Sequence, residues 1–282
     1  MAELVKHVLG ISGGRDSAAL AVYMRQEHPE IDMTYFFTDT GKELPEVYDF
    51  LGSLEGFLGK EIVRLNPNRD FDFWLTQYNH FLPSPRTRWC TKQLKIKPFE
   101  TWIKQFVQQG YRVVSYVAIR ADESHREGYV APDPKIRVTM PFREVGIDRE
   151  GVMRILEDSG VGLPAYYRWR SRSGCTFCFY QQKIEWVRLK REHPEAYDEA
   201  ARYEKDALSH GSPFTWAHKE SLLDLAKPER VAQIESDYEM RLKRMRGRKR
   251  VNLLQFDSAS DLDIDDLYGE DEGGGACLVC HK

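Results

Sequence analysis

The chain opens on an alternation of short apolar runs and longer amphipathic stretches. Residues 5–11, 33–37 and 111–119 are short, apolar and rich in β-branched or aromatic side chains, which predicts buried strands. Helical periodicity follows in 18–26 and 97–109. Strands that alternate with helices form right-handed βαβ units, so the pattern predicts an α/β fold with a parallel sheet flanked by helices.

Weaker forms of the same strand and helix patterns occur elsewhere in the chain and predict further elements. They place further elements at 44–57, 61–65, 135–140, 149–158, 181–209 and 219–246. The later helices are highly charged, and the chain after residue 256 is acidic and Gly-rich without periodicity, which is typical of a flexible tail. We therefore divide the chain into an α/β core (1–130), a mixed and then helical C-terminal segment (131–256) and an acidic tail (257–282).

Charge is unevenly distributed along the 282 residues, although the formal net charge is only −3. Subtracting the tail's eight acids and one lysine from totals of 44 and 41 leaves 36 acidic against 40 basic residues. A mildly basic body of this kind suits an enzyme that acts on nucleotides or nucleic acid. No apolar run reaches the roughly 18 residues that a membrane helix requires, and the N-terminal run is too short for a signal peptide. We therefore expect a cytoplasmic protein with no membrane partner.

The segment between the first strand and the first helix reads Ser-Gly-Gly-Arg-Asp-Ser. Glycines at such a turn let the backbone approach a phosphate, while hydroxyls, N–H groups and the helix dipole favour the anion. The alternative is an ordinary βα turn in which the acid and the second serine cap the helix. The Gly-Lys-Ser/Thr ending of a Walker A loop is absent. The residues predicted to bind phosphate are Ser12, Gly13, Gly14, Asp16 and Ser17.

Three further polar segments follow predicted strands or precede a predicted helix. The first lies where open α/β sheets bind ligands, or it is a simple turn; it comprises Thr38, Asp39, Thr40 and Gly41. The second, residues 118–126, reads Ala-Ile-Arg-Ala-Asp-Glu-Ser-His-Arg and is otherwise explained as a solvated charged loop. The third, residues 86–98, contains Arg-Trp-Cys followed by lysines.

These four segments together resemble the PP-loop family of N-type ATP pyrophosphatases, over residues 8–180. The Ser-Gly-Gly-x-Asp-Ser string is similar to the PP-loop, and the other three are similar to segments of phosphoadenosine-phosphosulfate reductases, although Ala118 replaces a usual Gly. The resemblance implies an adenine-nucleotide α-hydrolase-like (Rossmann-like) fold. It also implies that ATP, bound with Mg²⁺, is cleaved between its α and β phosphates. The residues to which it assigns charge stabilisation or catalysis are Asp16, Lys95, Arg120 and Arg126.

The five cysteines are an odd number, which argues against a disulfide framework. A Cys-x-x-Cys turn at Cys175 and Cys178 is compatible with zinc, an iron–sulfur cluster, a redox pair or inert buried thiols. Cys90 lies where related adenylyl-sulfate reductases place two adjacent cluster ligands, but here its neighbour is Trp89. The resemblance implies a [4Fe-4S] cluster on Cys90, Cys175 and Cys178, with a fourth site that is open or filled by Cys277 or Cys280.

A block at 241–250 has seven basic residues in ten, which favours nucleic-acid binding over a merely solvated helix end. Within the family, Arg-Trp-Cys with the Gly-Cys-x-Phe-Cys turn looks most like the DNA-phosphorothioation sulfurtransferases. The resemblance then implies adenylylation of a DNA or tRNA oxygen, a cysteine desulfurase as sulfur donor and a possible homodimer. The alternatives are a sulfonucleotide reductase that uses the C-terminal thiols, and an ATP-sensing component of a nucleic-acid-modifying or defence complex.

Overall fold

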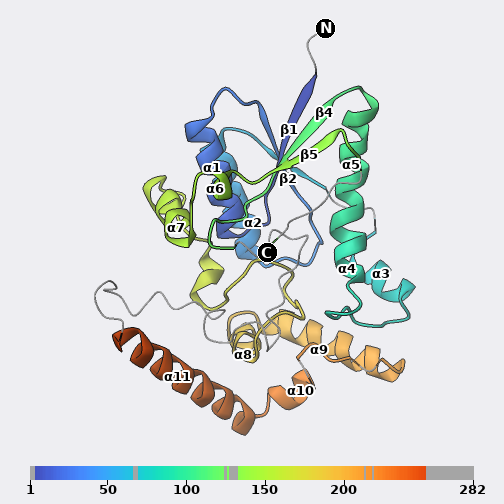
Figure 1. Ribbon diagram of the computed structural model, residues 1–282. Coiled ribbons are helices and arrows are strands. Elements are labelled where there is room, and N and C mark those ends of the chain that lie inside the picture. Colours follow the sequence, from blue (N-terminus) through green and yellow to red (C-terminus); the bar gives the residue numbers. More distant parts are fainter. Residues whose placement is uncertain are drawn as a thin grey trace.

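A computed structural model of the chain describes residues 4–65, 69–123, 126, 133–212, 214–217 and 219–251. Five strands form one parallel sheet in the order β3-β2-β1-β4-β5. The strands are β1 (Val5–Gly10), β2 (Met33–Phe37), β3 (Ile62–Arg64), β4 (Arg112–Tyr116) and β5 (Ile136–Thr139). The predicted α/β fold with a parallel sheet is therefore confirmed (Figure 1).

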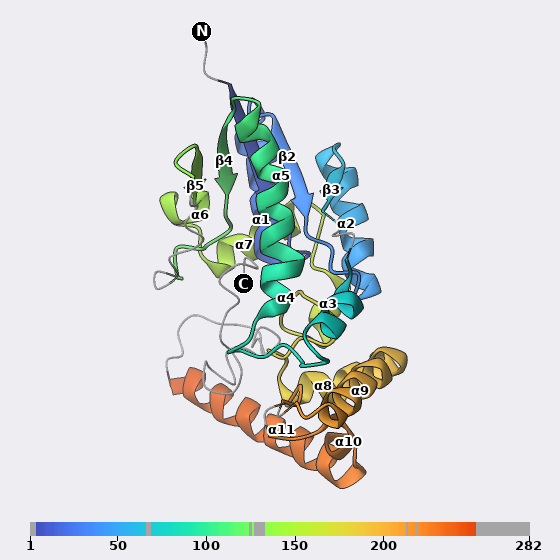
Figure 2. The same cartoon turned by 90° about the vertical axis from the view of Figure 1, so that its right-hand side faces the viewer.

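Helices cover both faces of this sheet. The larger apolar core lies on the face that carries α1 (Arg15–Glu27), α2 (Pro45–Leu58) and α7 (Arg149–Asp158). A smaller core lies under α5 (Lys97–Gln108), on the other face (Figure 2). Strand β1 serves both, because successive side chains of a strand point to opposite faces: Val8 packs in the smaller core and its neighbour Leu9 in the larger. This double burial explains why the second half of the strand, from Val8 onward, has no polar side chain.

The other helices are short or lie after the sheet. They are α3 (Phe71–Gln77), α4 (Trp89–Thr91), the π-helix η1 (Lys92–Ile96), α6 (Pro141–Glu144), the 3₁₀ helix η2 (Ala165–Arg168), α8 (Lys183–Glu192), α9 (Pro194–Ser209), α10 (Leu222–Leu225) and α11 (Pro228–Val251).

The two helices predicted at 181–209 and 219–246 are each divided in two. Pro194 lacks an N–H and disfavours a helical residue before it, so His193 leaves the helix with φ −137° and ψ 70° and separates α8 from α9. Pro228 begins α11 in the same way, after α10 has ended at Leu225. The predicted strand 111–119 is also shorter, because the chain after Tyr116 leaves the sheet.

The later helices lie beyond the carboxyl ends of the strands, below the sheet in both views (Figures 1 and 2). Two ion pairs attach α9 and its preceding residue to the segment after β2: Lys42 Nζ lies 2.7 Å from Glu199 Oε1, and His193 Nε2 lies 2.8 Å from Glu46 Oε1. Strand β5 and α7, which follow residue 130, pack on the core sheet. The three-part division of the chain stays a prediction.

Within the described residues, no helix combines the length and the apolar character needed to cross a membrane.

Glu204 of α9 is expected to control the pH dependence of stability in the helical segment. Its two carboxylate oxygens accept hydrogen bonds from the backbone N–H groups of Trp216 and Leu222, at 2.9 and 2.7 Å. Burial raises the pKa of Glu204, so its contribution to the free energy of unfolding falls as pH rises through its native pKa.

A Glu204→Gln variant should lose about 1–3 kcal/mol near neutral pH, because one amide nitrogen would face a backbone donor. It should also lose this part of the pH dependence. Urea denaturation between acid and neutral pH measures both effects, with exposed Glu157→Gln as the control. An unchanged pH dependence in Glu204→Gln would contradict the assignment.

Candidate functional site

The loop at residues 12–17 joins β1 to α1 at the carboxyl edge of the sheet. Gly13 has φ +74°, and a Cβ there would lie 2.6 Å from Val47 Cγ1 of α2. A Cβ on Gly14 would lie 2.9 Å from the hydroxyl oxygen of Ser173. Side chains are therefore excluded at both positions, by conformation and contact at the first and by contact at the second. The loop is closely packed from two directions.

The two serine hydroxyls of the 12–17 loop bond to the loop itself. Ser17 Oγ accepts from the backbone N–H of Ser12 at 3.0 Å and donates to the carbonyl of Gly14 at 3.1 Å. The two hydroxyl oxygens of Ser12 and Ser17 are 3.0 Å apart. The N-cap of α1 is Gly14, with no side-chain cap. The alternative in which Asp16 and Ser17 cap the helix is therefore not what the structure adopts.

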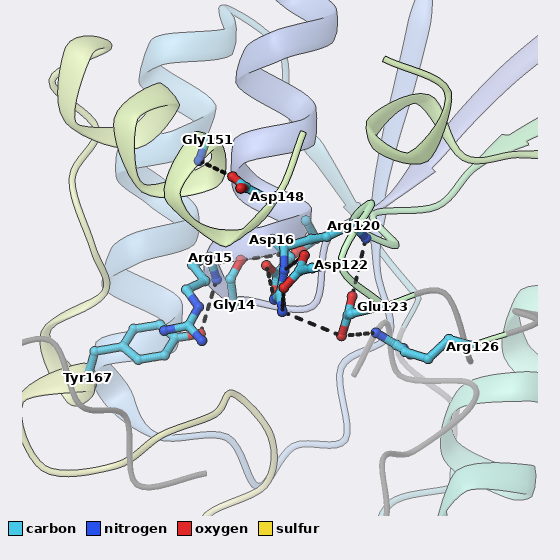
Figure 3. A network of polar contacts seen from close by, with 11 residues as sticks. Gly14, Arg15, Asp16, Arg120, Asp122, Glu123, Arg126, Asp148, Gly151 and Tyr167 are labelled. Atoms are coloured by element: carbon cyan, nitrogen blue, oxygen red, sulfur yellow. Dashed lines mark hydrogen bonds and ion pairs between the residues drawn. The ribbon is translucent and has the colours of Figure 1, made fainter. Parts of the chain in front are cut away.

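Asp16 and Arg120 form a buried ion pair at this loop (Figure 3). Arg120 Nη1 donates to Asp16 Oδ1 at 3.0 Å, and the two side chains are 8% and 5% exposed. The same guanidinium donates to both oxygens of Asp122, at 2.9 and 3.1 Å. The structure thus brings together two predicted site residues that are 104 positions apart. Asp16 lies in the first turn of α1, which follows β1, and Arg120 follows β4; these are neighbouring strands.

Arg126 is connected to Arg120 through Glu123. Its Nη1 donates to Glu123 Oε1 at 2.9 Å, and Glu123 also accepts from the backbone N–H of Arg120 at 3.2 Å. Arg143 Nη2 donates to the carbonyls of Glu123 and Arg126, at 2.8 and 2.7 Å. The Nε of Arg126 is buried without a hydrogen-bond partner. A bound oxyanion would supply the acceptor that this nitrogen lacks.

Two tyrosines that the sequence analysis missed hold the 12–17 loop from η2. Tyr166 Oη donates to the carbonyl of Gly13 at 2.7 Å, and the backbone N–H of Arg15 donates to Tyr167 Oη at 3.2 Å. The guanidinium of Arg15 lies 5.2 Å from the centre of the Tyr167 ring (Figure 3). Burial raises the pKa of both tyrosines, so they remain neutral hydroxyls at this site. Nothing in their sequence spacing distinguishes them from ordinary core aromatics.

Residues 38–41 follow β2 and contact the cysteine turn (residues 173–178). Thr40 Oγ1 donates to Glu43 Oε1 at 2.9 Å and lies 3.3 Å from Cys175 Sγ. The backbone N–H and the hydroxyl of Thr176 both donate to the carbonyl of Lys42, at 2.7 Å each. The cysteine turn is therefore fixed at the end of β2, next to the strand that carries the 12–17 loop. Asp39 Oδ1 instead accepts from the N–H of Gly41, at 2.8 Å.

Positive charge surrounds the two thiols of this turn. Arg170, 1% exposed, donates to the carbonyl of Cys175 at 2.8 Å. Burial and the Glu43 carboxylate raise the pKa of Cys175, while the ammonium of Lys95 opposes the rise. Burial also raises the pKa of Cys178, whereas the positive charges of Arg170 and Lys95, among other interactions, lower it. The thiols are thus neutral without a ligand, in surroundings that would stabilise thiolates bound to a metal.

Cys90 lies on α4, and one residue before it and one after it interact with the cysteine turn or with the residues just beyond that turn. The Arg88 guanidinium lies 5.7 Å from the Tyr180 ring centre, and Lys95 acts electrostatically on Cys175, as described above. Trp89 is a core residue, stacked on Tyr78 at 5.1 Å. Lys95 sits in the π-helix η1, a type of distortion often found at functional sites.

The sulfurs of Cys90, Cys175 and Cys178 do not all lie within 4.8 Å of one another in the described structure. A closed tetrahedral zinc site needs sulfurs only about 3.8 Å apart, from Zn–S bonds of about 2.3 Å. Thiolates on a cubane bind different iron atoms and lie farther apart than those of a closed zinc site. Cys277 and Cys280 lie outside the described residues. The ligand assignment stays a prediction.

Alkylation of the ligand-free protein should be slow at the cysteine turn. Because burial raises the pKa values of Cys175 and Cys178, less thiolate is present at pH 8 than for an ordinary cysteine. Iodoacetamide labelling followed by peptide mass spectrometry should show these two thiols reacting more slowly than the same peptides in urea, with a rise only at higher pH. Equal rates in both conditions would contradict the burial and charge arrangement.

Comparisons with known proteins identify one family model that matches part of the chain. Residues 6–131 match the family model described as phosphoadenosine phosphosulfate reductase domain. No curated protein sequence matches the chain.

Two solved structures are similar to it. One is a phosphoadenylyl-sulfate (PAPS) reductase from Candida auris in a phosphate complex, with 13% identity, TM-score 0.46 and coverage of 60% of this chain and 81% of that chain. The other is the U34-tRNA thiolase NcsA from Methanococcus maripaludis with its [4Fe-4S] cluster, with 14% identity, TM-score 0.37 and coverage of 73% and 72%. Residues 6–131 are thus similar to the phosphoadenosine phosphosulfate reductase domain of the PP-loop family, and the matched family consists of enzymes of sulfur chemistry.

Proposed function

We propose that this protein is an ATP pyrophosphatase that adenylylates a nucleic-acid oxygen so that sulfur can replace it, as in DNA phosphorothioation. One observation carries the proposal: the 12–17 loop and the cysteine turn lie at the ends of the adjacent strands β1 and β2. The side chains of Thr40 and Cys175 are 3.3 Å apart there. A nucleotide on the loop would therefore react close to the thiols.

The 12–17 loop would hold the phosphates of ATP with Mg²⁺. A carboxylate offers about four lone-pair sites, so Asp16 can accept from Arg120 and still bind a cation. Arg120 and Arg126 would stabilise negative charge on the phosphates, and residues 38–41 would lie beside the nucleoside. In the first step, the nucleic-acid oxygen attacks the α-phosphorus and the bond to pyrophosphate breaks.

In the second step, sulfur at the oxidation level of sulfide attacks the activated phosphorus, and AMP leaves with the original oxygen. Cys90, Cys175 and Cys178 would hold a [4Fe-4S] cluster, which supplies an iron site for sulfur when bound. Lys95 would hold negative charge near these thiols. We also propose that a cysteine desulfurase supplies the sulfur as a persulfide. A thiol reductant would then bring this sulfur to the level of sulfide.

The basic end of α11 supports a nucleic-acid acceptor. Lys243 and Arg244 are exposed on this helix, and Arg241 is half-buried. DNA and tRNA share the phosphate chemistry that would bind here, and the homodimer that the sequence suggests would double this surface. Each neutralised phosphate should add about 0.9 to the slope of binding affinity against salt concentration on duplex DNA.

Pyrophosphate release with and without duplex DNA or tRNA tests the proposal. Asp16→Asn keeps an oxygen for Arg120 but removes the charge for Mg²⁺, so release should fall by about 10²-fold, the effect of losing one charge-stabilising group. Asp148→Asn, an N-cap of α7 outside the loop, is the matched control. Sulfite release from adenylyl sulfate with thioredoxin would instead establish a reductase. ATP binding without any turnover would establish a nucleotide sensor.

A further inference from the structure

A second group of potential metal ligands, separate from the cysteines, lies at the C-terminal end of α9, where the helix meets the turn after α3. Asp206 and His210 are on this helix and at its C-cap, and His80 comes from the turn after α3. One ligand atom from each of the three lies within 4.8 Å of the others, the only such group of three or more in the described residues. His80 Nδ1 is 2.6 Å from Asp206 Oδ2, and His210 Nδ1 is 3.8 Å from Asp206 Oδ1.

The backbone conformation of α9 and of the turn after α3 brings the three side chains close together. Residues four apart on a helix share a face, which places Asp206 and His210 side by side. The turn that follows α3 has two successive residues in the left-handed region, Asn79 at φ 51° and His80 at φ 59°. Backbone hydrogen bonds from Asn79 to Thr76 (3.0 Å) and from His80 to Leu75 (2.9 Å) hold this turn and direct the His80 ring to α9.

The bonding within the group is incomplete. The Nδ1 of His80 is buried and has no aligned hydrogen bond, although a carboxylate oxygen is close to it. The two imidazole rings are nearly parallel, with centres 4.4 Å apart. A cation between the three side chains would give the buried nitrogen a partner and would use the carboxylate charge. Two imidazoles and one carboxylate form a donor set typical of zinc and other first-row divalent ions.

We propose that His80, Asp206 and His210 bind one divalent transition-metal ion, such as Zn²⁺, and that this ion fastens α9 to the α3 turn. The three side chains come from segments 126 residues apart in sequence, so the ion would join the core to the helical segment. Asp206 and His210 are 48% and 47% exposed, which leaves room for water on the ion.

The ion would affect the sulfur site only indirectly, by fixing α9 against α3. Lys42 lies 3.1 Å from Asp72 of α3 and also pairs with Glu199 of α9. Tyr203 of α9 donates to Asp72 as well. The carbonyl of Lys42 holds the cysteine turn, through Thr176. A tighter junction between α3 and α9 therefore stabilises the segment on which the cysteine turn rests.

Cobalt(II) distinguishes this site from a thiolate site in the full-length, metal-free protein. Co²⁺ bound by nitrogen and oxygen gives weak visible bands, whereas thiolate ligands add an intense charge-transfer band in the near ultraviolet. We expect one equivalent of Co²⁺ to give the visible bands without that charge-transfer band, and Zn²⁺ to displace it.

His80→Gln, Asp206→Asn and His210→Gln should each weaken Co²⁺ binding by more than the roughly 10–100-fold that loss of an outer-shell partner costs. Exposed His28→Gln, beside Glu30, is the matched control and should leave it unchanged. Zn²⁺ should also raise the melting temperature of the wild type more than that of His210→Gln, a difference that thiol-bound zinc would not produce. Three results would each overturn the proposal. Co²⁺ could give no visible bands, its bands could always appear together with the thiolate charge-transfer band, or all variants could bind it with equal affinity.

Discussion

Replacing Arg120 with Met is expected to lower the free energy of unfolding by about 3–5 kcal/mol, because it removes a cation from the buried carboxylate of Asp16. The guanidinium bonds to both Asp16 and Asp122 and lies 3.9 Å from Glu123. The Asp16 side chain is only 5% exposed, so water cannot replace the lost charge there, whereas Glu123 keeps its pair with Arg126. Removing one partner of a buried pair costs far more than the pair contributes.

Urea denaturation measures this loss, with Arg154→Met as the control. Arg154 lies on α7, 66% exposed, and its 3.9 Å pair with Glu150 should contribute less than about 1 kcal/mol. The double variant Asp16→Asn/Arg120→Met should recover part of the stability, because residue 16 then no longer buries the charge that Arg120 compensated. A loss in Arg120→Met no larger than that of the control would show that the network is solvated and not buried.

This pair also decides which variant can test turnover. The sequence suggests that the side chains of the 12–17 loop face a ligand, so that Ser12→Ala with Asp16→Ala would leave the fold intact. In the structure these side chains bond within the protein, to Ser17 and to Arg120. Loss of activity in that double variant would be mixed with loss of stability. Asp16→Asn keeps the bond to Arg120 and separates the two effects.

The site residues that directly follow strands could be predicted from the sequence, because the apolar pattern of each strand shows where the strand ends. The apolar run of β1, the glycines after it and the periodic helix α1 specify the 12–17 loop without any distant contact. Arg120 was likewise placed by β4, whose carboxyl end lies beside that of β1 in a parallel sheet. The resemblance to a family was needed only to assign chemistry to these positions.

Features that depend on distant packing were not predictable. Tyr166 and Tyr167 contact residues 153 and 152 positions away, and their sequence does not differ from that of other core aromatics. The π-helix that carries Lys95 has no periodic signature of its own, because it is one turn inside a longer helix. The break between α8 and α9 did have a local signal, Pro194, which the charged helical periodicity around it concealed.

Single replacement of Cys90, Cys175 or Cys178 by Ser is expected to remove nearly all cluster iron and to abolish sulfur transfer. Thiolates are soft ligands that a serine hydroxyl cannot replace, and a cluster held by three of them cannot lose one without losing its hold on the protein. ATP binding should survive in each variant, because its phosphate contacts are on the 12–17 loop. The loop and the cysteine turn meet closely through Gly14 and Ser173, so a small change in affinity is compatible with this.

Iron and sulfide assays with visible absorbance, on protein purified anaerobically, measure the cluster, and nucleotide-binding calorimetry measures the loop. The tail supplies the comparison: Cys277→Ser and Cys280→Ser should keep the iron if the fourth site is open, and loss of iron in one of them would identify it as the fourth ligand. Thr40→Val, which removes only the hydroxyl 3.3 Å from Cys175, should keep the iron. A colourless wild type whose bound zinc is lost in Cys175→Ser but kept in His80→Gln would refute the cluster. Cys175 and Cys178 would then be a structural clip, because the thiols would bind a metal with no sulfur chemistry of its own.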